Sequence, residues 1–289
     1  MLNFMGILFD GLAYGMLLFL ISVGLSVTLG LMGFINLAHG VFAMAGGYLL
    51  VMLMERFGMG FMASLPVIFV AVALTSLVLE RTLYRPLYKS PHLDQVLMTV
   101  GIIFVAVAGA TYFWGAGQQP VTIPVWMRGQ LSVAGLDLSR YRLFLMVVGV
   151  LITLLLVFGL ERTRFGACVR ASVERARTAE AMGIHVGRVF QLTFAIGSGL
   201  AGLGGALGVN VLGLDPGFPL KFLVYFLLIV VVGGPGKVIG TLLAALLLGV
   251  ADTAAKYYVP ETGAFVIYIA MIALLLLFPN GLLGRRKVI

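Results

Sequence analysis

Two polar side chains, Asn36 and His39, stand in an otherwise apolar stretch and are flanked by Gly33 and Gly40. Polar residues at membrane depth usually face the interior of a helix bundle or an aqueous path. Unwound backbone is tolerated there only where protein or a water-filled cavity covers it. The pattern therefore fits a broken helix that lines a substrate path. An interfacial loop, or a helix–helix hydrogen bond from Asn36, fits the same residues equally well.

Segment 161–188 concentrates charge, and its Ala-rich part, 169–182, is predicted to be a helix that stops at Gly183. Opposite charges recur three or four residues apart and would meet on the helix surface. These pairs are Arg170/Glu174, Glu174/Arg177 and Arg177/Glu180. Small residues also share one helix face, namely Ser172, Ala176, Ala179 and Gly183. That face is flat enough for another protein's groove; a solvated connecting helix held by ion pairs is the alternative.

A third feature interrupts the long apolar stretch 221–252, which exceeds one membrane span. The interruption reads Gly233-Gly234-Pro235-Gly236-Lys237. Glycine and proline break helices, and a lysine does not favour a lipid-facing position. We expect two segments joined by a turn, the first short enough to cross only part of the membrane. Small residues four apart over 197–208 instead predict close helix packing.

The residues offer little for catalysis. His39, His92 and His185 lie in separate segments without metal-ligand spacing, and Cys168 is the single cysteine. The sequence has no Gly-x-x-x-x-Gly-Lys-Ser/Thr loop to hold a nucleotide phosphate. We therefore expect no metal, no catalytic residue and no ATP bound in that manner.

Composition indicates which elements position these residues. The 289 residues are 61% hydrophobic and only 10% charged, whereas soluble domains have about 25% charged residues. A span needs about 20 predominantly apolar residues. Apart from 221–252, the candidate spans are 6–30, 38–54, 61–80, 94–115, 142–160, 189–212 and 262–282. The predicted fold is all-α, a polytopic transmembrane bundle of about 8 spans with broken or re-entrant helices.

Basic residues set the predicted orientation, because cytoplasmic loops collect Lys and Arg. They gather in 81–93, in 161–188 and at the C-terminus, so these parts are predicted inside and loop 116–141 outside. Counting spans then places the N-terminus outside, and 221–252 must begin and end outside, as a broken segment can. The net charge of +8 is explained by these loops, so we expect no nucleic-acid partner.

Three blocks carry a family resemblance along nearly the whole chain. They read GLMGFINLAHGVFAMAGGY, then RTRFGACVRASVERARTAEAMGIHVGRVFQLTFAIGSGLAGLGGAL, and finally KFLVYFLLIVVVGGPGKVIGTLLAALLLGV with LLLLFPNGLLG. In this order they resemble the permease subunits of branched-chain amino acid ABC transporters, in particular the H-type subunit of leucine/isoleucine/valine uptake systems. The inside loop departs from the common Glu-Ala-Ala-then-Gly form, since it reads Ala179-Glu180-Ala181-Met182-Gly183.

The resemblance implies one permease domain over 1–289 in a bacterial inner membrane, paired as a heterodimer with an M-type permease. Two cytoplasmic ATPases would bind the ATP, and a periplasmic binding protein would deliver the amino acid. Loop 161–188 would hold the coupling helix that docks on an ATPase. The residues implied in coupling are Arg170, Ser172, Glu174, Ala176, Ala179, Glu180 and Gly183. The segment from Gly33 to Gly40 would line the path or fix the broken helix around it.

The sequence is also compatible with other transport functions. Related permeases carry urea or short amides. A secondary transporter without ATPases would instead need charged residues within its spans, and the acidic candidates, Asp10 and Asp252, lie near span ends. An intramembrane enzyme would need a paired catalytic set, which the sequence does not offer.

Overall fold

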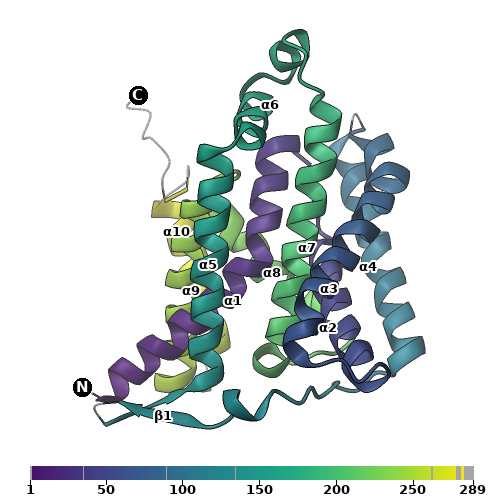
Figure 1. The fold of residues 1–289 in the computed structure, drawn as a ribbon. Helices are drawn as coiled ribbons and strands as arrows, with labels where there is room; N and C mark the ends of the chain where they lie inside the picture. Colours follow the sequence, from purple (N-terminus) through teal and green to yellow (C-terminus); the bar gives the residue numbers. More distant parts are fainter. Residues whose placement is uncertain are drawn as a thin grey trace.

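The computed structural model describes residues 2–34, 36–88, 90–133, 135–261, 263–277 and 281–282. Helices dominate these ranges (Figure 1). The α-helices are α1 (Leu2–Met32), α2 (His39–Glu55), α3 (Phe61–Leu79), α4 (His92–Trp114), α5 (Arg140–Arg162), α6 (Arg164–Ala181), α7 (Val186–Leu212), α8 (Phe218–Gly233), α9 (Val238–Tyr258) and α10 (Gly263–Leu277). The all-α prediction is confirmed.

Within the described ranges, six helical segments are long and apolar enough to cross a membrane, whereas α2 and α8 are shorter. The six begin in α1, α3, α4, α5, α7 and α9. In α1 and α7, 78% and 83% of the most apolar window is buried inside the molecule, against 17% in α4 and 22% in α5. Helices α1 and α7 therefore form the centre of the bundle, and α4 and α5 present apolar side chains outward, as lipid contact requires.

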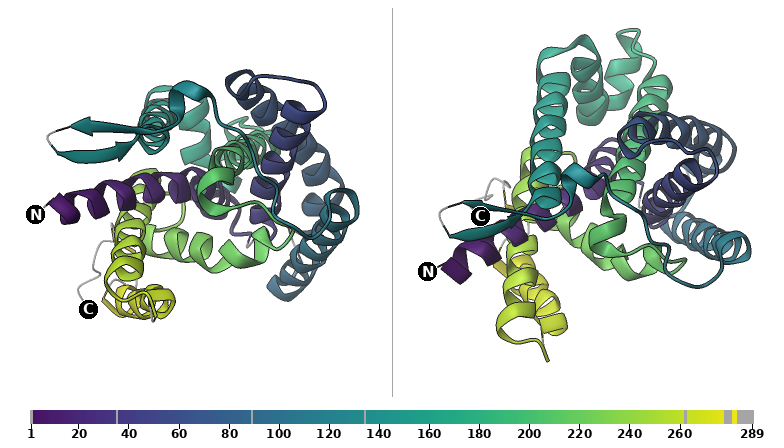
Figure 2. Two further views of the ribbon diagram at one scale, coloured as in Figure 1. Left: turned by 90° about the horizontal axis from the view of Figure 1, so that it is seen from below. Right: turned by 60° about the horizontal axis from the view of Figure 1, so that its bottom comes forward.

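The same arrangement occurs twice: a long central helix is followed by a short one, as α1 by α2 and α7 by α8. The two long helices pack against each other, and so do the two short ones (Figure 2). Glycines allow the closest approaches, because Gly24 meets the backbone of Gly197, and Gly205 meets the backbone of Ala43. The packing role predicted for 197–208 is confirmed.

The predicted break is also confirmed. Helix α8 ends at Gly233 and α9 begins at Val238. Gly234 and Gly236 adopt φ of +87° and +78°, a region that glycine enters without the steric cost of a side chain. The spans predicted elsewhere begin and end within a few residues of the observed helices.

Three features differ from the prediction or fall outside it. A hairpin of β1 (Gln130–Val133) and β2 (Leu136–Ser139) lies in the predicted outer loop, for which no secondary structure was predicted from the sequence. After α3 the chain continues as a π-helical turn, Glu80–Tyr84, and a 3₁₀ turn, Arg85–Leu87. Lys89 and the C-terminal Arg285, Arg286 and Lys287, used to assign orientation, lie outside the described residues.

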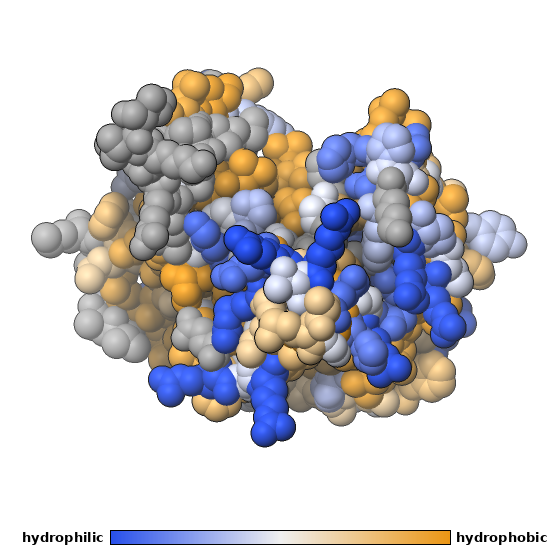
Figure 3. Space-filling model, turned by 90° about the horizontal axis from the view of Figure 1, so that it is seen from above, coloured by the Kyte–Doolittle hydropathy of each residue, from blue (hydrophilic) through white to orange (hydrophobic). Residues whose placement is uncertain are grey.

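The two ends of the bundle differ in character. Helix α6 projects from one end, and the hairpin lies at the other, near the N-terminus (Figure 1). Seen from the α6 end, hydrophilic side chains gather over the middle of the face, with hydrophobic ones around them (Figure 3). This distribution matches a water-exposed end on a bundle with an apolar perimeter. The molecule is a multi-pass membrane protein.

Candidate functional site

The break between α1 and α2 buries both of its polar side chains. His39 is the first residue of α2 and is 2% exposed, and its Nε2 lies 2.8 Å from the carbonyl oxygen of Ile21. A carbonyl accepts only, so the ring donates through Nε2. Asn36 is 1% exposed, and its Oδ1 accepts a hydrogen bond from the Tyr84 hydroxyl over 3.3 Å. Both side chains thus face the bundle interior rather than an interfacial loop.

Aromatic rings enclose this break. The Tyr84 ring lies 5.6 Å from the Phe34 ring and 4.9 Å from the Phe194 ring, between centroids. Phe42, three residues after His39, meets Phe194 edge to face. Phe34 and Phe42 flank the break, whereas Tyr84 and Phe194 come from distant parts of the chain, so the rings bind the break to α7 and to the turn after α3. Asn36 therefore sits in an apolar shell.

The two glycines of this segment act differently. Gly33 adopts a φ of +60°, and a side chain there would meet open space, so its role is to turn the backbone. Gly40 instead allows close packing, because a Cβ there would lie 3.1 Å from the Pro219 Cα and 3.3 Å from the Phe226 ring. The start of α2 therefore rests directly on α8. All four predicted path residues lie at this junction or beside it.

Sequence reasoning missed three residues near this break: Glu80, Tyr84 and Tyr88. Glu80 is 1% exposed, and its Oε1 accepts a hydrogen bond of 2.7 Å from the Tyr88 hydroxyl. Burial, and then the hydrogen bond to Glu80, raise the pKa of Tyr88, so this phenol stays protonated as a donor. Their spacing of four residues at the end of an apolar run was the available signal, because such residues share a helix face.

Two polar atoms of this region have no hydrogen-bond partner among the described residues. They are Glu80 Oε2 and Asn36 Nδ2, both buried. One is an acceptor and the other a donor. A buried polar group without a partner costs about 1–3 kcal/mol, so such a pair is typical of a functional region rather than of a packed core.

The second break packs on the same helix as the first. The Gly236 amide donates a hydrogen bond to the Ser26 carbonyl oxygen over 2.8 Å. The Thr241 hydroxyl, one turn into α9, donates to the Ser26 hydroxyl over 2.7 Å. Gly30 faces Gly236 without a side chain between them. The last turns of helix α1 thus contact the second break, and the first break follows directly after α1 in the chain.

Helix α6 corrects one prediction. Arg175 has φ −152° and ψ +86°, which kinks the helix in its middle. Ser172 and Ala179 lie on either side of the kink, and each is only 2% exposed. The predicted continuous face of Ser172, Ala176, Ala179 and Gly183 is therefore wrong: the kink divides it, and two of its members pack against their own chain.

The predicted ion pairs of α6 are also missing from the part of the chain that the structure describes. Its salt bridges are Arg142–Asp10, Lys221–Asp215 and Lys256–Asp252. Arg170, Glu174, Arg177 and Glu180 are exposed instead. The charged side chains of α6 are thus left available on its surface rather than joined along the helix.

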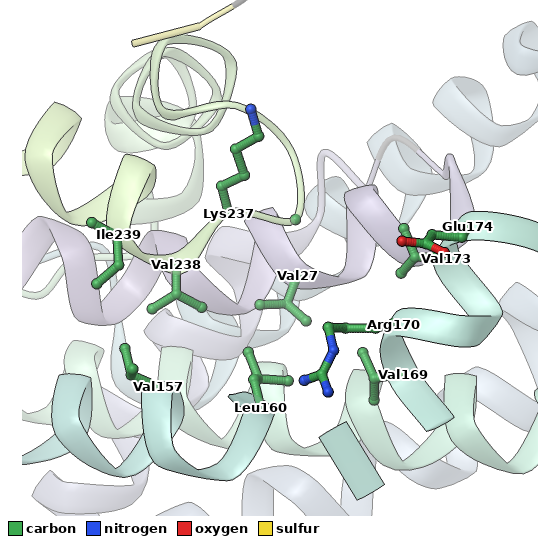
Figure 4. Close-up of a pocket in the computed structure, with 11 residues that line it drawn as sticks. Val27, Val157, Leu160, Val169, Arg170, Val173, Glu174, Lys237, Val238 and Ile239 are labelled. Carbon is green, nitrogen blue, oxygen red and sulfur yellow. The ribbon is translucent and has the colours of Figure 1, made fainter. Parts of the chain in front are cut away.

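A cavity of about 340 Å³ joins α6 to the second break (Figure 4). Arg170 and Glu174 line it from α6, and Lys237 lines it from the break. Val27 of α1 and Leu160 of α5 form apolar parts of its wall. Helix α6 also packs directly on α1, so a displacement of α6 would act on α1 and through it on both breaks.

The sequence model of a family described as "Branched-chain amino acid transport system / permease component" matches residues 7–275. The chain belongs to this family. As a transport permease it is not an enzyme, and no three His, Cys, Asp or Glu side chains of the described residues are grouped to hold a metal. The family assignment places the two breaks and α6 in a transport protein.

Individual relatives cover this permease almost end to end. It is 28% identical to the high-affinity branched-chain amino acid permease BraD of Pseudomonas aeruginosa, over 97% of this chain and 96% of BraD. It is 27% identical to LivH of Escherichia coli K12, over 99% of this chain and 97% of LivH. LivM of the same organism is 24% identical, over 94% of this chain and 69% of LivM. No solved structure matches the permease significantly.

Proposed function

We propose that this permease is the H-type subunit of an ABC importer that carries branched-chain or related hydrophobic amino acids into the cytoplasm. The observation that carries the proposal is the end-to-end similarity to BraD and LivH, both named as high-affinity branched-chain amino acid permeases. The chain needs no catalytic group for this task, because the energy comes from ATP bound by partner subunits.

The partners follow from the same proposal. A second, M-type permease completes a heterodimer, which the weaker similarity to LivM supports. Two cytoplasmic ATPases dock on the permeases, here through α6, and a periplasmic binding protein delivers the substrate. The permease then lies in the bacterial inner membrane with α6 and the C-terminus in the cytoplasm and the N-terminus outside, in agreement with the hydrophilic α6 face (Figure 3).

The two breaks give the proposal a mechanism. ATP-driven movement of the ATPases displaces α6, and the packing of α6 against α1 passes this movement to α1. The segment holding Gly33, Asn36, His39 and Gly40 then opens or closes the path. The unpaired Asn36 amide and Glu80 oxygen suit the carboxylate and ammonium of a passing amino acid, while the surrounding rings suit its side chain.

Reconstitution tests the proposal. The permease, its M-type partner and the two ATPases are placed in proteoliposomes, and uptake of radioactive leucine is measured with the binding protein outside. We expect uptake that requires both ATP and the binding protein. Deletion of 170–183 should abolish uptake while membrane insertion persists. Uptake without ATPases would support a secondary transporter instead, and transport of urea or short amides but not leucine would contradict the substrate class.

A further inference from the structure

A second cavity adjoins the one in Figure 4 and is almost wholly apolar. Its volume is about 400 Å³, and its walls are formed by α1, α3, α5 and α7 together with the start of α6. Val27 and Leu160 line both cavities, so the two spaces meet at these residues. We propose that the two cavities together bind one anionic glycerophospholipid, with an acyl chain in the apolar cavity and the phosphate beside Arg170. This site is independent of the substrate path.

The apolar cavity has the lining that a hydrocarbon chain requires. Its walls include Phe69, Leu156, Phe165, Ile196 and Leu203. The close contact of Gly24 with Gly197 lies at the same place, and both glycines line the cavity. From Leu160 to Ile152 the cavity follows about 12 Å of α5, at 1.5 Å per residue. Water finds almost no partners in such a space, whereas an acyl chain fills it.

One polar side chain at the wall of the apolar cavity indicates the kind of ligand. Thr193 lines the cavity and is 5% exposed, yet its hydroxyl has no hydrogen-bond partner among the described residues. The residue lies seven positions after the start of α7, or about 10 Å along the helix from the polar end. An ester carbonyl of a phospholipid lies just below its headgroup. A rotation of the Thr193 side chain about χ1 would bring its buried hydroxyl to the cavity, where such a carbonyl accepts its hydrogen bond.

The cavity shown in Figure 4 supplies the positive charge for the phosphate. Figure 4 shows the Arg170 guanidinium turned toward Leu160, at the junction of the two cavities. Within the described part of the chain, no hydrogen bond or ion pair engages this guanidinium. A guanidinium binds phosphate through two parallel hydrogen bonds. Lys237 lines the same cavity, and Figure 4 shows its side chain directed away from Arg170, so the Arg170 guanidinium is the group that favours an anionic headgroup.

The two halves of α6 then have different roles, lipid binding before the kink and protein docking after it. Arg170 lies before the kink at Arg175 and turns to the lipid, whereas the exposed residues after the kink remain free to meet another protein. The lipid would fill the space between α5 and α7 next to α6. It would therefore stabilise the start of α6 against the bundle while leaving the end of the helix available.

Native mass spectrometry of the full-length permease tests the site. The protein is purified in mild detergent, and phosphatidylglycerol or phosphatidylcholine is titrated back while the retained lipid is counted. We expect one tightly held phosphatidylglycerol. Gly159→Leu fills the apolar cavity, since a Cβ at Gly159 meets open space, and should lower retention at least tenfold. Gly109→Leu makes the same change at an equally open helix position outside both cavities, and retention should stay at the wild-type level.

Two further variants separate the contacts. Thr193→Val keeps the side-chain shape and should weaken phosphatidylglycerol binding about three- to tenfold through the lost hydrogen bond. Arg170→Gln should remove the preference for phosphatidylglycerol over phosphatidylcholine. Unchanged retention in both Gly159→Leu and Thr193→Val would overturn the site, and so would displacement of the lipid by free leucine. If Gly159→Leu fails to fold, Thr193→Val decides.

Discussion

The backbone amide of Gly236 donates a hydrogen bond to the carbonyl oxygen of Ser26 over 2.8 Å. This bond ties the break between α8 and α9 to the last turns of α1. The contact is possible because Gly30, one turn beyond Ser26, has no side chain to hold Gly236 away. A movement of the second break therefore acts directly on the helix that leads into the first.

Gly30→Ala should disrupt this contact. A Cβ at position 30 would lie 2.5 Å from the Gly236 nitrogen and 3.0 Å from the Pro235 carbonyl carbon, so the backbone of the break must shift. We expect the free energy of unfolding to fall by about 1–3 kcal/mol, as for other overpacked interiors, and ATP-driven uptake to fall with it. Denaturation in detergent and uptake in proteoliposomes measure the two effects. Gly101→Ala, in open space on α4, should change neither; equal losses in both variants would contradict the account.

The helices and both breaks were predictable from the sequence for a physical reason. In a bilayer each segment must satisfy its own backbone hydrogen bonds, so hydropathy alone locates the spans. Glycine and proline at Gly233–Gly236, and glycine at Gly33, then mark where the helices stop. Tertiary packing had little freedom to override these signals, which is why α8 and α9 separate where expected.

The candidate site was only partly predictable, because its contacts join distant segments. Asn36 was identified as a polar residue in an apolar run, but its partner Tyr84 is 48 residues away. The four-residue spacing from Glu80 to Tyr88 indicates a shared helix face, but it does not indicate that this face turns inward at a π-helical turn. No glycine or proline directly precedes the kink at Arg175, so the sequence predicts a regular helix there. The prediction of one continuous small-residue face on α6 was wrong for this reason.

Tyr88→Phe should expose the cost of burying Glu80. The substitution removes the donor of a 2.7 Å hydrogen bond to the buried Glu80 carboxyl group, and a buried acceptor left without a partner costs about 1–3 kcal/mol. We expect a loss of that size in denaturation measurements. Combining it with Glu80→Gln should cost less than the sum of the two single changes, because the amide needs the phenol less. Strict additivity would show that the two side chains act separately; Tyr112→Phe, on the exposed face of α4, serves as the control.

Met182→Asp should separate folding from coupling. Met182 is 78% exposed at the end of α6, beyond the kink, so the change should leave stability within about 0.5 kcal/mol. Under the proposed function it should weaken ATPase association about tenfold, because a charge replaces an apolar contact. Co-purification of the ATPases measures this. Val125→Asp is the matched control, since Val125 is 79% exposed in the predicted outer loop. Normal ATPase association with Met182→Asp would show that the ATPases dock on a different surface of the permease.

Asp252→Asn distinguishes an ATP-driven permease from an ion-coupled one. The Asp252 side chain is 1% exposed and holds Lys256 at 2.6 Å, and Lys256 itself is 55% exposed. The variant therefore loses a charge-assisted contact without burying a lone ammonium, and we expect about 1–2 kcal/mol of destabilisation. Uptake per folded molecule should stay within twofold of wild type, and collapse of the proton and sodium gradients should not change it. Asp10→Asn, at the more exposed pair with Arg142, should cost about 0–1 kcal/mol. A folded Asp252→Asn protein without uptake would instead support ion coupling, because an intramembrane carboxylate that binds a transported proton or cation cannot be replaced by an amide.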